Sequence, residues 1–217
     1  MSRETLRVLL VGATGLVGKH CLDALRADRR VAAITVLQRG APRTAGGDAR
    51  LRVLQIDFDR LDALPADTFR VDAAICALGT TIGKAGSQAA FRRVDHDYVL
   101  AVAQRARAAG ASRFGLVSAL GAEVGSRVFY NRVKGEIEVA IEALEFDSLS
   151  IVRPSLLLGD RDEFRLGERL SAPLGRLLPR RWRAVPANAV ARALVESVLR
   201  GEKLTRRIEN AELLGVG

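Results

Sequence analysis

The sequence predicts an α/β fold, in which one doubly wound parallel sheet carries a small C-terminal lobe. Apolar segments of strand length alternate with longer segments of helical period, as they do in parallel sheets with crossover helices. The strand at 8–11, VLLV, is apolar on both faces, which indicates helices on each side of the sheet. A glycine-rich turn also joins the first apolar strand directly to the first helical segment.

The expected elements follow from these periods in order along the chain. Strands are expected at 6–11, 32–37, 51–56, 71–78, 113–118 and 148–153, with a short one at 206–209. Helices are expected at 16–27, 88–109, 130–145 and 187–199. The glycine-rich stretch 40–47 follows the second strand and is expected to be a loop.

Length and composition favour a single domain over residues 1–217, since 48% hydrophobic content suits one compact core. Prolines interrupt the region after Arg153, and we expect the segment at about 155–186 to cover the substrate. No apolar stretch approaches the roughly 18 residues that span a bilayer, and the N-terminus has no signal-like segment. Cys21 and Cys76 lack the spacing of a metal site or disulfide framework. We therefore expect a cytoplasmic protein with no membrane partner and no metal.

The chain is basic, with 34 Lys and Arg residues against 25 Asp and Glu and a net charge of +9. Such a charge can attract nucleic acid, anionic lipid or a phosphorylated ligand. The arginines are scattered, however, and few aromatic residues stand between them to stack on bases. This pattern favours a solvated basic surface over a nucleic-acid interface.

The turn between the first strand and the first helix carries the strongest functional signal. Gly12, Gly15 and Gly18 have the spacing of a dinucleotide-binding turn, and the flanking strand and helix supply the context that this motif needs. The chain must bend at the first glycine, approach phosphate oxygens at the second, and pack the helix on the strand at the third. We predict a Rossmann-type site for a dinucleotide pyrophosphate, formed by Gly12, Thr14, Gly15, Leu16, Val17 and Gly18.

The end of the second strand indicates which dinucleotide binds. An acidic residue there would bond the adenosine ribose 2′-hydroxyl and favour NAD, but the sequence reads Leu37, Gln38, Arg39. Arg39 can instead pair with a 2′-phosphate, which favours NADP(H). The alternative is that Arg39 is only a solvated loop residue.

Later strand ends contribute further predicted cofactor contacts. Asp57 could accept a bond from the adenine amine with Phe58 beside it, or Asp57 could cap the next short helix while Phe58 joins the core. The fourth strand ends at the same edge, where a glycine permits close approach of the backbone to the ligand. The predicted contacts there are Ala77, Leu78, Gly79 and Thr80.

The helix expected from about Tyr130 carries a lysine on its inward face. At about 100° per residue, Tyr130 and Lys134 share the apolar stripe that contains Ile137 and Ile141. Because burying an ammonium is costly, this placement indicates a polar cleft, in which the ammonium would stabilise the phenolate form of Tyr130. Ser118, at the end of the fifth strand, could bond the same substrate oxygen. The alternative is a lysine that snorkels and a tyrosine at the edge of the core.

These residues resemble the short-chain dehydrogenase/reductase superfamily through GATGLVG, Ser118 and the YxxxK pattern from Tyr130 to Lys134. Longer strings resemble its atypical branch, typified by the HIV Tat-interacting oxidoreductase: CALGTTIGKAG (76–86), RVDHDYVLA (93–101), FYNRVKGEIE (129–138) and VRPSLLLGDR (152–161). The resemblance implies Tyr130 as catalytic acid/base, Lys134 on the nicotinamide ribose and Ser118 orienting substrate. Pro154, in the last string, is a further predicted cofactor contact. Asp95 stands where the superfamily usually has asparagine, which questions the proton relay through that position.

The leading functional hypothesis is an NADP(H)-dependent oxidoreductase that reduces a carbonyl or quinone-like small molecule. The catalytic residues would be Ser118, Tyr130 and Lys134. The alternative is a non-catalytic NADP(H) sensor that regulates through a protein partner. The expected state is a monomer or homodimer.

Overall fold

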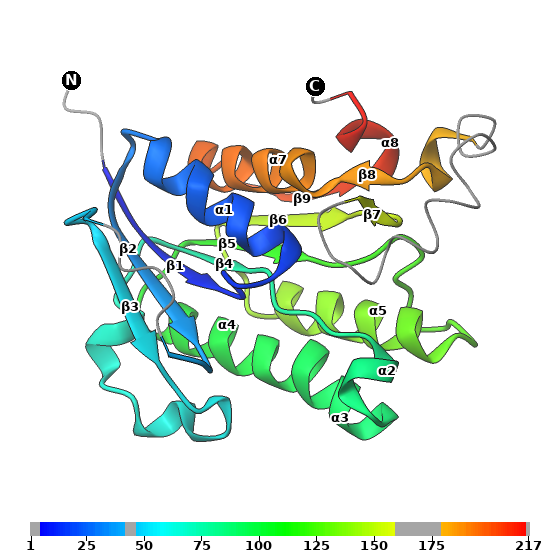
Figure 1. Cartoon of the computed structure of the whole chain (residues 1–217), viewed down its shortest axis with the longest axis horizontal. Helices are drawn as coiled ribbons and strands as arrows, with labels where there is room; N and C mark the ends of the chain where they lie inside the picture. Colours follow the sequence, from blue (N-terminus) through cyan, green and yellow to red (C-terminus); the bar gives the residue numbers. More distant parts are fainter. Residues whose placement is uncertain (1–4, 42–46, 159–178, 216–217) are drawn as a thin grey trace.

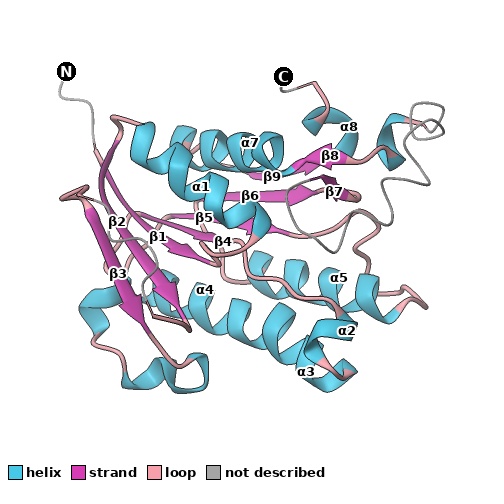
Figure 2. Cartoon of the chain, viewed as in Figure 1, coloured by secondary structure: helices cyan, strands magenta, loops and turns pink. Residues whose placement is uncertain are grey.

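The computed structural model describes residues 5–41, 47–158 and 179–215, which form a parallel sheet of seven strands between two layers of helices (Figure 1 and Figure 2). The predicted doubly wound α/β fold is therefore confirmed. Residues 159–178, most of the segment expected to cover the substrate, lie outside the described residues, as does much of the glycine-rich loop at 42–46.

The sheet has the strand order β3-β2-β1-β4-β5-β6-β9. Its strands are β1 (Leu6–Val11), β2 (Val31–Gln38), β3 (Leu51–Gln55), β4 (Ala73–Cys76), β5 (Arg113–Val117), β6 (Ser148–Arg153) and β9 (Thr205–Glu209). Two short strands, β7 (Leu157–Leu158) and β8 (Val185–Pro186), pair separately. The order reverses between β1 and β4, and ligands of doubly wound sheets bind at the carboxyl edge beside such a reversal.

The longer helices lie close to their expected positions, whereas the two helices of four residues were not expected. They are α1 (Leu16–Ala27), α2 (Ile82–Ala85), α3 (Gln88–Arg92), α4 (Tyr98–Ala108), α5 (Phe129–Glu142), α7 (Ala187–Arg200) and α8 (Asn210–Leu213). Short 3₁₀ turns occupy Phe58–Ala63, Ala66–Phe69 and Arg180–Trp182. A π-helical turn at Arg93–Asp97 joins α3 to α4.

Two apolar cores hold the layers together, one on each face of the sheet. Helices α1 and α7 cover one face, and α4 and α5 cover the other (Figure 1). Strand β1 supplies both cores, since Val8 and Leu10 face the first while Leu9 and Val11 face the second. Each of these four side chains is at most 1% exposed. Their alternation explains why the strand is apolar at every position.

The structure differs from the sequence prediction where helices are irregular. The helix expected at 88–109 is interrupted by the π turn, which inserts an extra residue into the helical spacing. The described residues between β2 and β3 form no helix, and only 3₁₀ turns separate β3 from β4. The described connections from β2 to β3 and from β3 to β4 therefore contain no α-helix, in contrast to the regular alternation of strands and helices that the sequence suggests.

Helix α5 packs unusually close to the loop that precedes it. A Cβ atom on Gly135 would stand 2.4 Å from the carbonyl carbon of Glu123 and 2.5 Å from the amide nitrogen of Val124. Only glycine permits this approach, because the atoms in the way belong to the backbone. The position of α5, and of every side chain on its inward face, depends on this contact.

We predict that Gly135→Ala lowers the unfolding free energy by roughly 1–3 kcal/mol, because α5 and the loop must move apart. Urea denaturation of the variant and the wild-type chain measures the change. Gly83→Ala is the control, since no heavy atom lies within 4 Å of its added Cβ. Equal stability of all three chains would contradict the close packing described here.

Candidate active site

The glycine turn has the geometry that its sequence predicts. Gly12 has a φ of 88°, and a Cβ there would stand 2.5 Å from the carbonyl group of Ala77 on the neighbouring strand end. A Cβ on Gly18 would lie 1.9 Å from the carbonyl oxygen of Gly12, so this glycine lets α1 pack on the turn. Gly15 begins α1 without a side-chain cap. The first amides of this helix are thus available to an anion at its N-terminus.

Most of the predicted site residues line one cavity of about 350 Å³ at the carboxyl edge of the sheet. The turn, the end of β4, the end of β5 and the start of α5 all contribute to it. The sequence-predicted residues in its lining are Gly15, Leu16, Val17, Ala77, Leu78, Gly79, Thr80, Ser118, Tyr130, Lys134 and Pro154. The fold therefore brings together predicted residues from five separate parts of the chain.

A second cavity of about 470 Å³ continues from the first, sharing Gly15 and the segment 77–80 with it. Gly12, Thr14 and Arg39 from the predicted set line it. Its other cationic lining residues are Lys84 and Arg93, and no carboxylate lines it among the described residues. Arg39 also lines a shallow outer cavity beside Asp57. The cavities form a path from the Tyr130 end to Arg39.

Asp57 and Phe58 have the structural roles that the alternative interpretation gave them. The Asp57 carboxylate accepts a hydrogen bond of 2.9 Å from the amide of Asp59 and begins the 3₁₀ turn. Phe58 is 5% exposed and packs on the Tyr98 ring at 5.3 Å between centroids. Contact of Asp57 with an adenine amine stays a prediction, whereas the Phe58 ring belongs to the core.

Lys134 points inward, as its place on the helix predicts, and it is 4% exposed. Its Nζ lies 2.8 Å from Oδ1 of Asp95, which is 1% exposed. Burial by itself lowers the pKa of Lys134, but the charge of Asp95 and the Tyr130 phenol raise it more, so the pKa lies above its ordinary value. Lys134 is therefore an ammonium at neutral pH. The stability that comes from the raised pKa of Lys134 is fully present below the ordinary lysine pKa, and it is lost as pH rises through the raised pKa.

Asp95 reaches this position because it lies in the π turn between α3 and α4. Its second oxygen, Oδ2, accepts a hydrogen bond of 2.8 Å from the Thr80 amide at the end of β4. One carboxylate thus holds both the lysine and the strand end that lines the cavities. The sequence identified Asp95 only as a departure from asparagine, since no simple helical period foretells a π turn.

Ser118 is also buried, and its hydroxyl is hydrogen-bonded within the protein. The hydroxyl donates a short hydrogen bond to the Glu138 carboxylate, and Glu138 is 2% exposed. Arg153 donates to the same carboxylate from Nε at 3.0 Å and from Nη2 at 2.5 Å. Glu209, on the edge strand β9, lies 3.1 Å from Nη1 of Arg153.

Sequence reasoning missed Glu138, although its spacing contained the signal. Tyr130, Lys134 and Glu138 follow one another at intervals of four residues, so all three lie near one face of α5. The sequence analysis identified only Tyr130 and Lys134 as polar residues on this face. The inward face of α5 carries three polar groups beside its apolar stripe, and the Tyr130 ring packs on Phe91 at 5.3 Å between centroids.

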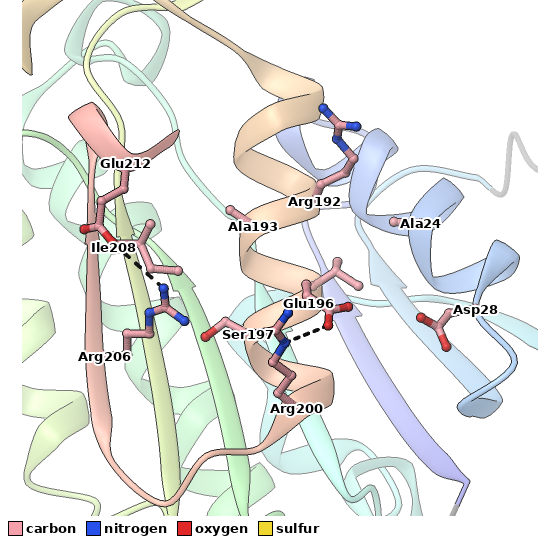
Figure 3. A pocket seen from close by; sticks show the side chains of 11 residues that line it. Ala24, Asp28, Arg192, Ala193, Glu196, Ser197, Arg200, Arg206, Ile208 and Glu212 are labelled. Carbon is pink, nitrogen blue, oxygen red and sulfur yellow. Dashed lines mark hydrogen bonds and ion pairs between the residues drawn. The ribbon is translucent and has the colours of Figure 1, made fainter. Parts of the chain in front are cut away.

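A further cavity of about 480 Å³ lies outside this site, around helix α7 (Figure 3). Arg206 and Glu212 approach each other on one side of the helix, while Ala24 of α1 and Asp28, which follows α1, lie on its other side (Figure 3). Its basic residues stand among acidic ones, as in the Arg200–Glu196 pair at 2.8 Å. The described lining includes none of the residues that the sequence predicted for the functional site.

The cysteines are core residues, as their isolated positions suggested. Cys21 and Cys76 are both buried, and burial raises the pKa of each thiol to about 12. In the described ranges, no group of three His, Cys, Asp or Glu side chains could hold a metal ion. The same ranges contain no helix that is long and apolar enough to cross a membrane.

Comparison with known proteins identifies the family. A family model described as NAD(P)H-binding matches residues 12–200. Protein HTATIP2 of Rattus norvegicus is 38% identical over 216 residues, covering 97% of this chain and 88% of that protein. Protein FMP52, mitochondrial, of Eremothecium gossypii is 35% identical over 225 residues, covering 97% of each. These matches support a nicotinamide dinucleotide, NAD(H) or NADP(H), as the cofactor.

Solved structures agree with the fold. MoeE5 in complex with UDP-glucose and NAD has a TM-score of 0.72 at 17% identity, with 94% of this chain and 76% of that chain covered. The Bordetella bronchiseptica enzyme WbmG in complex with NAD has a TM-score of 0.71 at 14% identity, with 96% and 74% covered. At this identity the likeness concerns the fold alone.

The expectation of a cytoplasmic protein is corrected by the same comparison. The fungal relatives from Eremothecium gossypii, Emericella nidulans and Candida albicans are all named mitochondrial. The expectation rested on the lack of a signal-like segment and on cysteine usage. Neither observation distinguishes the cytoplasm from a mitochondrial compartment, which explains the error.

We predict that Asp95→Ala lowers the unfolding free energy by roughly 3–5 kcal/mol at neutral pH, because it leaves a buried ammonium without its counter-ion. Adding Lys134→Met should restore part of this loss, since no unpaired charge then remains. Urea denaturation of the wild-type chain, both single variants and the double variant gives the coupling. A double variant no more stable than Asp95→Ala would show that the pair does not act as described.

Proposed function

The chain belongs to the NAD(P)H-binding family of short-chain dehydrogenase/reductases, and we propose that it is an NADP(H)-dependent oxidoreductase that reduces a carbonyl or quinone-like small molecule. The observation that carries this proposal is the cavity in which Tyr130 and Lys134 stand beside the glycine turn. A dinucleotide along the path of cavities would place one end near Tyr130 and the other near Arg39.

The residues of the turn fit such a cofactor, because Gly12 and Gly18 have no room for a Cβ and the start of α1 faces the cavities. When bound, the nicotinamide supplies a hydride to the carbonyl carbon. Tyr130 donates the proton that the carbonyl oxygen needs to become a hydroxyl. Lys134, held as an ammonium by Asp95, stabilises the phenolate that remains on Tyr130. The positive charge that stabilises the phenolate thus comes from the same helix, α5, as Tyr130.

The preference for NADP(H) rests on Arg39. It lines both the second and the outer cavity, next to the end of β2 where an acidic residue would otherwise favour NAD. A guanidinium there can form charge-assisted hydrogen bonds with a 2′-phosphate. Arg93 lines the same cavity, but its Nη2 is 2.6 Å from Oδ1 of Asp59. Arg39 is therefore the residue that we assign to the 2′-phosphate.

Tyr130→Phe should reduce kcat by roughly 10²–10⁴-fold, since the phenol is the proton donor. Its affinity for NADPH should stay within about twofold of the wild-type value. The measurement is NADPH oxidation with a panel of aldehydes, ketones and quinones, alongside titration of the cofactor by calorimetry. NADPH binding with no wild-type turnover above the Tyr130→Phe background would refute the reductase assignment and favour the cofactor-sensing alternative.

Arg39→Ala should weaken NADPH binding by roughly tenfold to a hundredfold and leave NADH binding nearly unchanged. Arg52→Ala is a matched control, because it removes the same charge from an exposed position on β3 that lines none of these cavities. Calorimetric titration with both cofactors separates the two effects. Equal losses for NADPH and NADH would contradict the assignment to the 2′-phosphate.

A further inference from the structure

Asn210, the first residue of α8, is 0% exposed, although it lines neither cavity of the candidate site. Its side-chain amide forms hydrogen bonds at both ends. Oδ1 accepts from the backbone amide of Ser155 at 2.8 Å. Nδ2 donates to the backbone carbonyl oxygens of Arg183 at 2.8 Å and Arg180 at 3.2 Å. One buried side chain therefore joins two backbone segments that are distant in the sequence.

The first of these segments forms part of the cavity in which Tyr130 and Lys134 lie. Residues 155–157, here called the wall segment, all line this cavity. The ladders that join β6 to β5 and to β9 end at Val152 and Arg153, before the wall segment begins. The backbone groups of the wall segment therefore need partners outside the main sheet.

The wall segment obtains these partners from the chain that precedes α7. The Ser155 hydroxyl donates to the carbonyl oxygen of Arg183 at 2.5 Å, and the amide of Val185 donates to the carbonyl oxygen of Leu156 at 2.9 Å. The contact continues as the short β7–β8 pair. Asn210 bonds to both sides of it, through the Ser155 amide and the Arg183 carbonyl. Its position therefore determines how the two sides meet.

Asn210 is itself held by the edge of the main sheet. Glu209, which ends β9 directly before it, accepts from Nη1 of Arg153 at 3.1 Å. The Glu209 amide donates to Oε1 of Glu212 at 3.0 Å, within a capping box that begins α8. Because β9 pairs with β6, the place of Asn210 follows from the sheet and does not depend on the wall segment.

We infer that Asn210 is a positioning residue for the nicotinamide end of the cofactor, because it holds the wall segment in the cavity of Tyr130. The inference rests on the proposed function, which puts the nicotinamide near Tyr130 and the 2′-phosphate near Arg39. The wall segment contributes no residue to the second cavity, which Arg39 lines. Loss of the Asn210 amide should therefore weaken binding at one end of the dinucleotide and spare the other end.

Two ligands separate these ends: NADPH, and adenosine 2′,5′-bisphosphate, which carries the 2′-phosphate but no nicotinamide. Asn210→Ala should weaken NADPH binding roughly tenfold and change binding of the bisphosphate by less than about twofold. Calorimetric titration of the folded variant measures both affinities. A general loss of stability would lower the two affinities together, so the contrast separates positioning from a merely structural role.

Asn210→Asp is a second variant that keeps the size of the side chain and the acceptor for the Ser155 amide. It replaces the donor with an oxygen that faces the carbonyl groups of Arg180 and Arg183, so it should show the same contrast between the two ligands. Asn188→Ala is the matched control, because Asn188 is an exposed asparagine of α7 that lines neither cavity. Its affinities should match those of the wild-type chain.

Trp182 reports on the same contact without any ligand. It is the single tryptophan of the chain, and it lies in the 3₁₀ turn whose first residue, Arg180, accepts from Asn210. In Asn210→Ala and Asn210→Asp we expect lower fluorescence anisotropy than in the wild-type chain, since the turn loses one of its bonds. Unchanged anisotropy in both variants would show that Asn210 does not hold this turn, and would overturn the inference.

The outcomes distinguish failure of the inference from failure of the proposed function, provided that NADPH oxidation by the wild-type chain is measured with the carbonyl panel. Equal losses for the two ligands, or no loss for NADPH, would overturn the inference while wild-type turnover keeps the reductase assignment. A loss confined to NADPH, with no wild-type turnover, would support the role of Asn210 and overturn the reductase assignment. If the wild-type chain binds NADPH no better than the bisphosphate, the wall segment does not serve the nicotinamide end and the inference is wrong.

Discussion

The buried ammonium group of Lys134 constrains the candidate site at the carboxyl edge of the sheet. Lys134 belongs to α5 and to the cavity lining, where it is buried. A charge at such a position requires a buried counter-charge. Asp95 provides it, and the same carboxylate also holds the Thr80 amide. The end of β4 and the start of α4 are therefore tied to α5 through one side chain. Other features of the cavity, including the place of Tyr130, follow from where this helix lies.

Much of the fold could be predicted from the sequence, because its signals are local. The strand at 6–11 and the helix at 16–27 have the bounds that their apolar periods predict, and the glycine spacing gave the turn between them. Tyr130, Lys134 and Ser118 were likewise identified from helix geometry and strand ends. Each of these inferences needs only residues that are close together in the chain.

The rest of the site depends on contacts between distant segments, which local patterns do not encode. The π turn inserts one residue into the helical spacing and so changes the direction in which Asp95 points. The residues next to Asp95 in the sequence give no sign of this insertion. The pairing of Glu138 with Arg153 depends on the register of α5 against β6. Ser118 was expected to contact the substrate oxygen, which stays a prediction, and its hydrogen bond to the Glu138 carboxylate was not foreseen.

Arg153 joins two carboxylates: Glu138, which accepts from Ser118 in the cavity lining, and Glu209 on β9. No described residue of β9 lines the cavity itself. Asn210, the next residue, fixes Ser155 in turn. The candidate site is therefore supported by Glu209, which lies 56 residues beyond Arg153 in the chain. A truncation after β6 would keep the glycine turn, Tyr130 and Lys134, yet it would remove the Glu209 carboxylate that holds Arg153. The smallest unit that preserves this pocket is the full seven-stranded sheet together with α8.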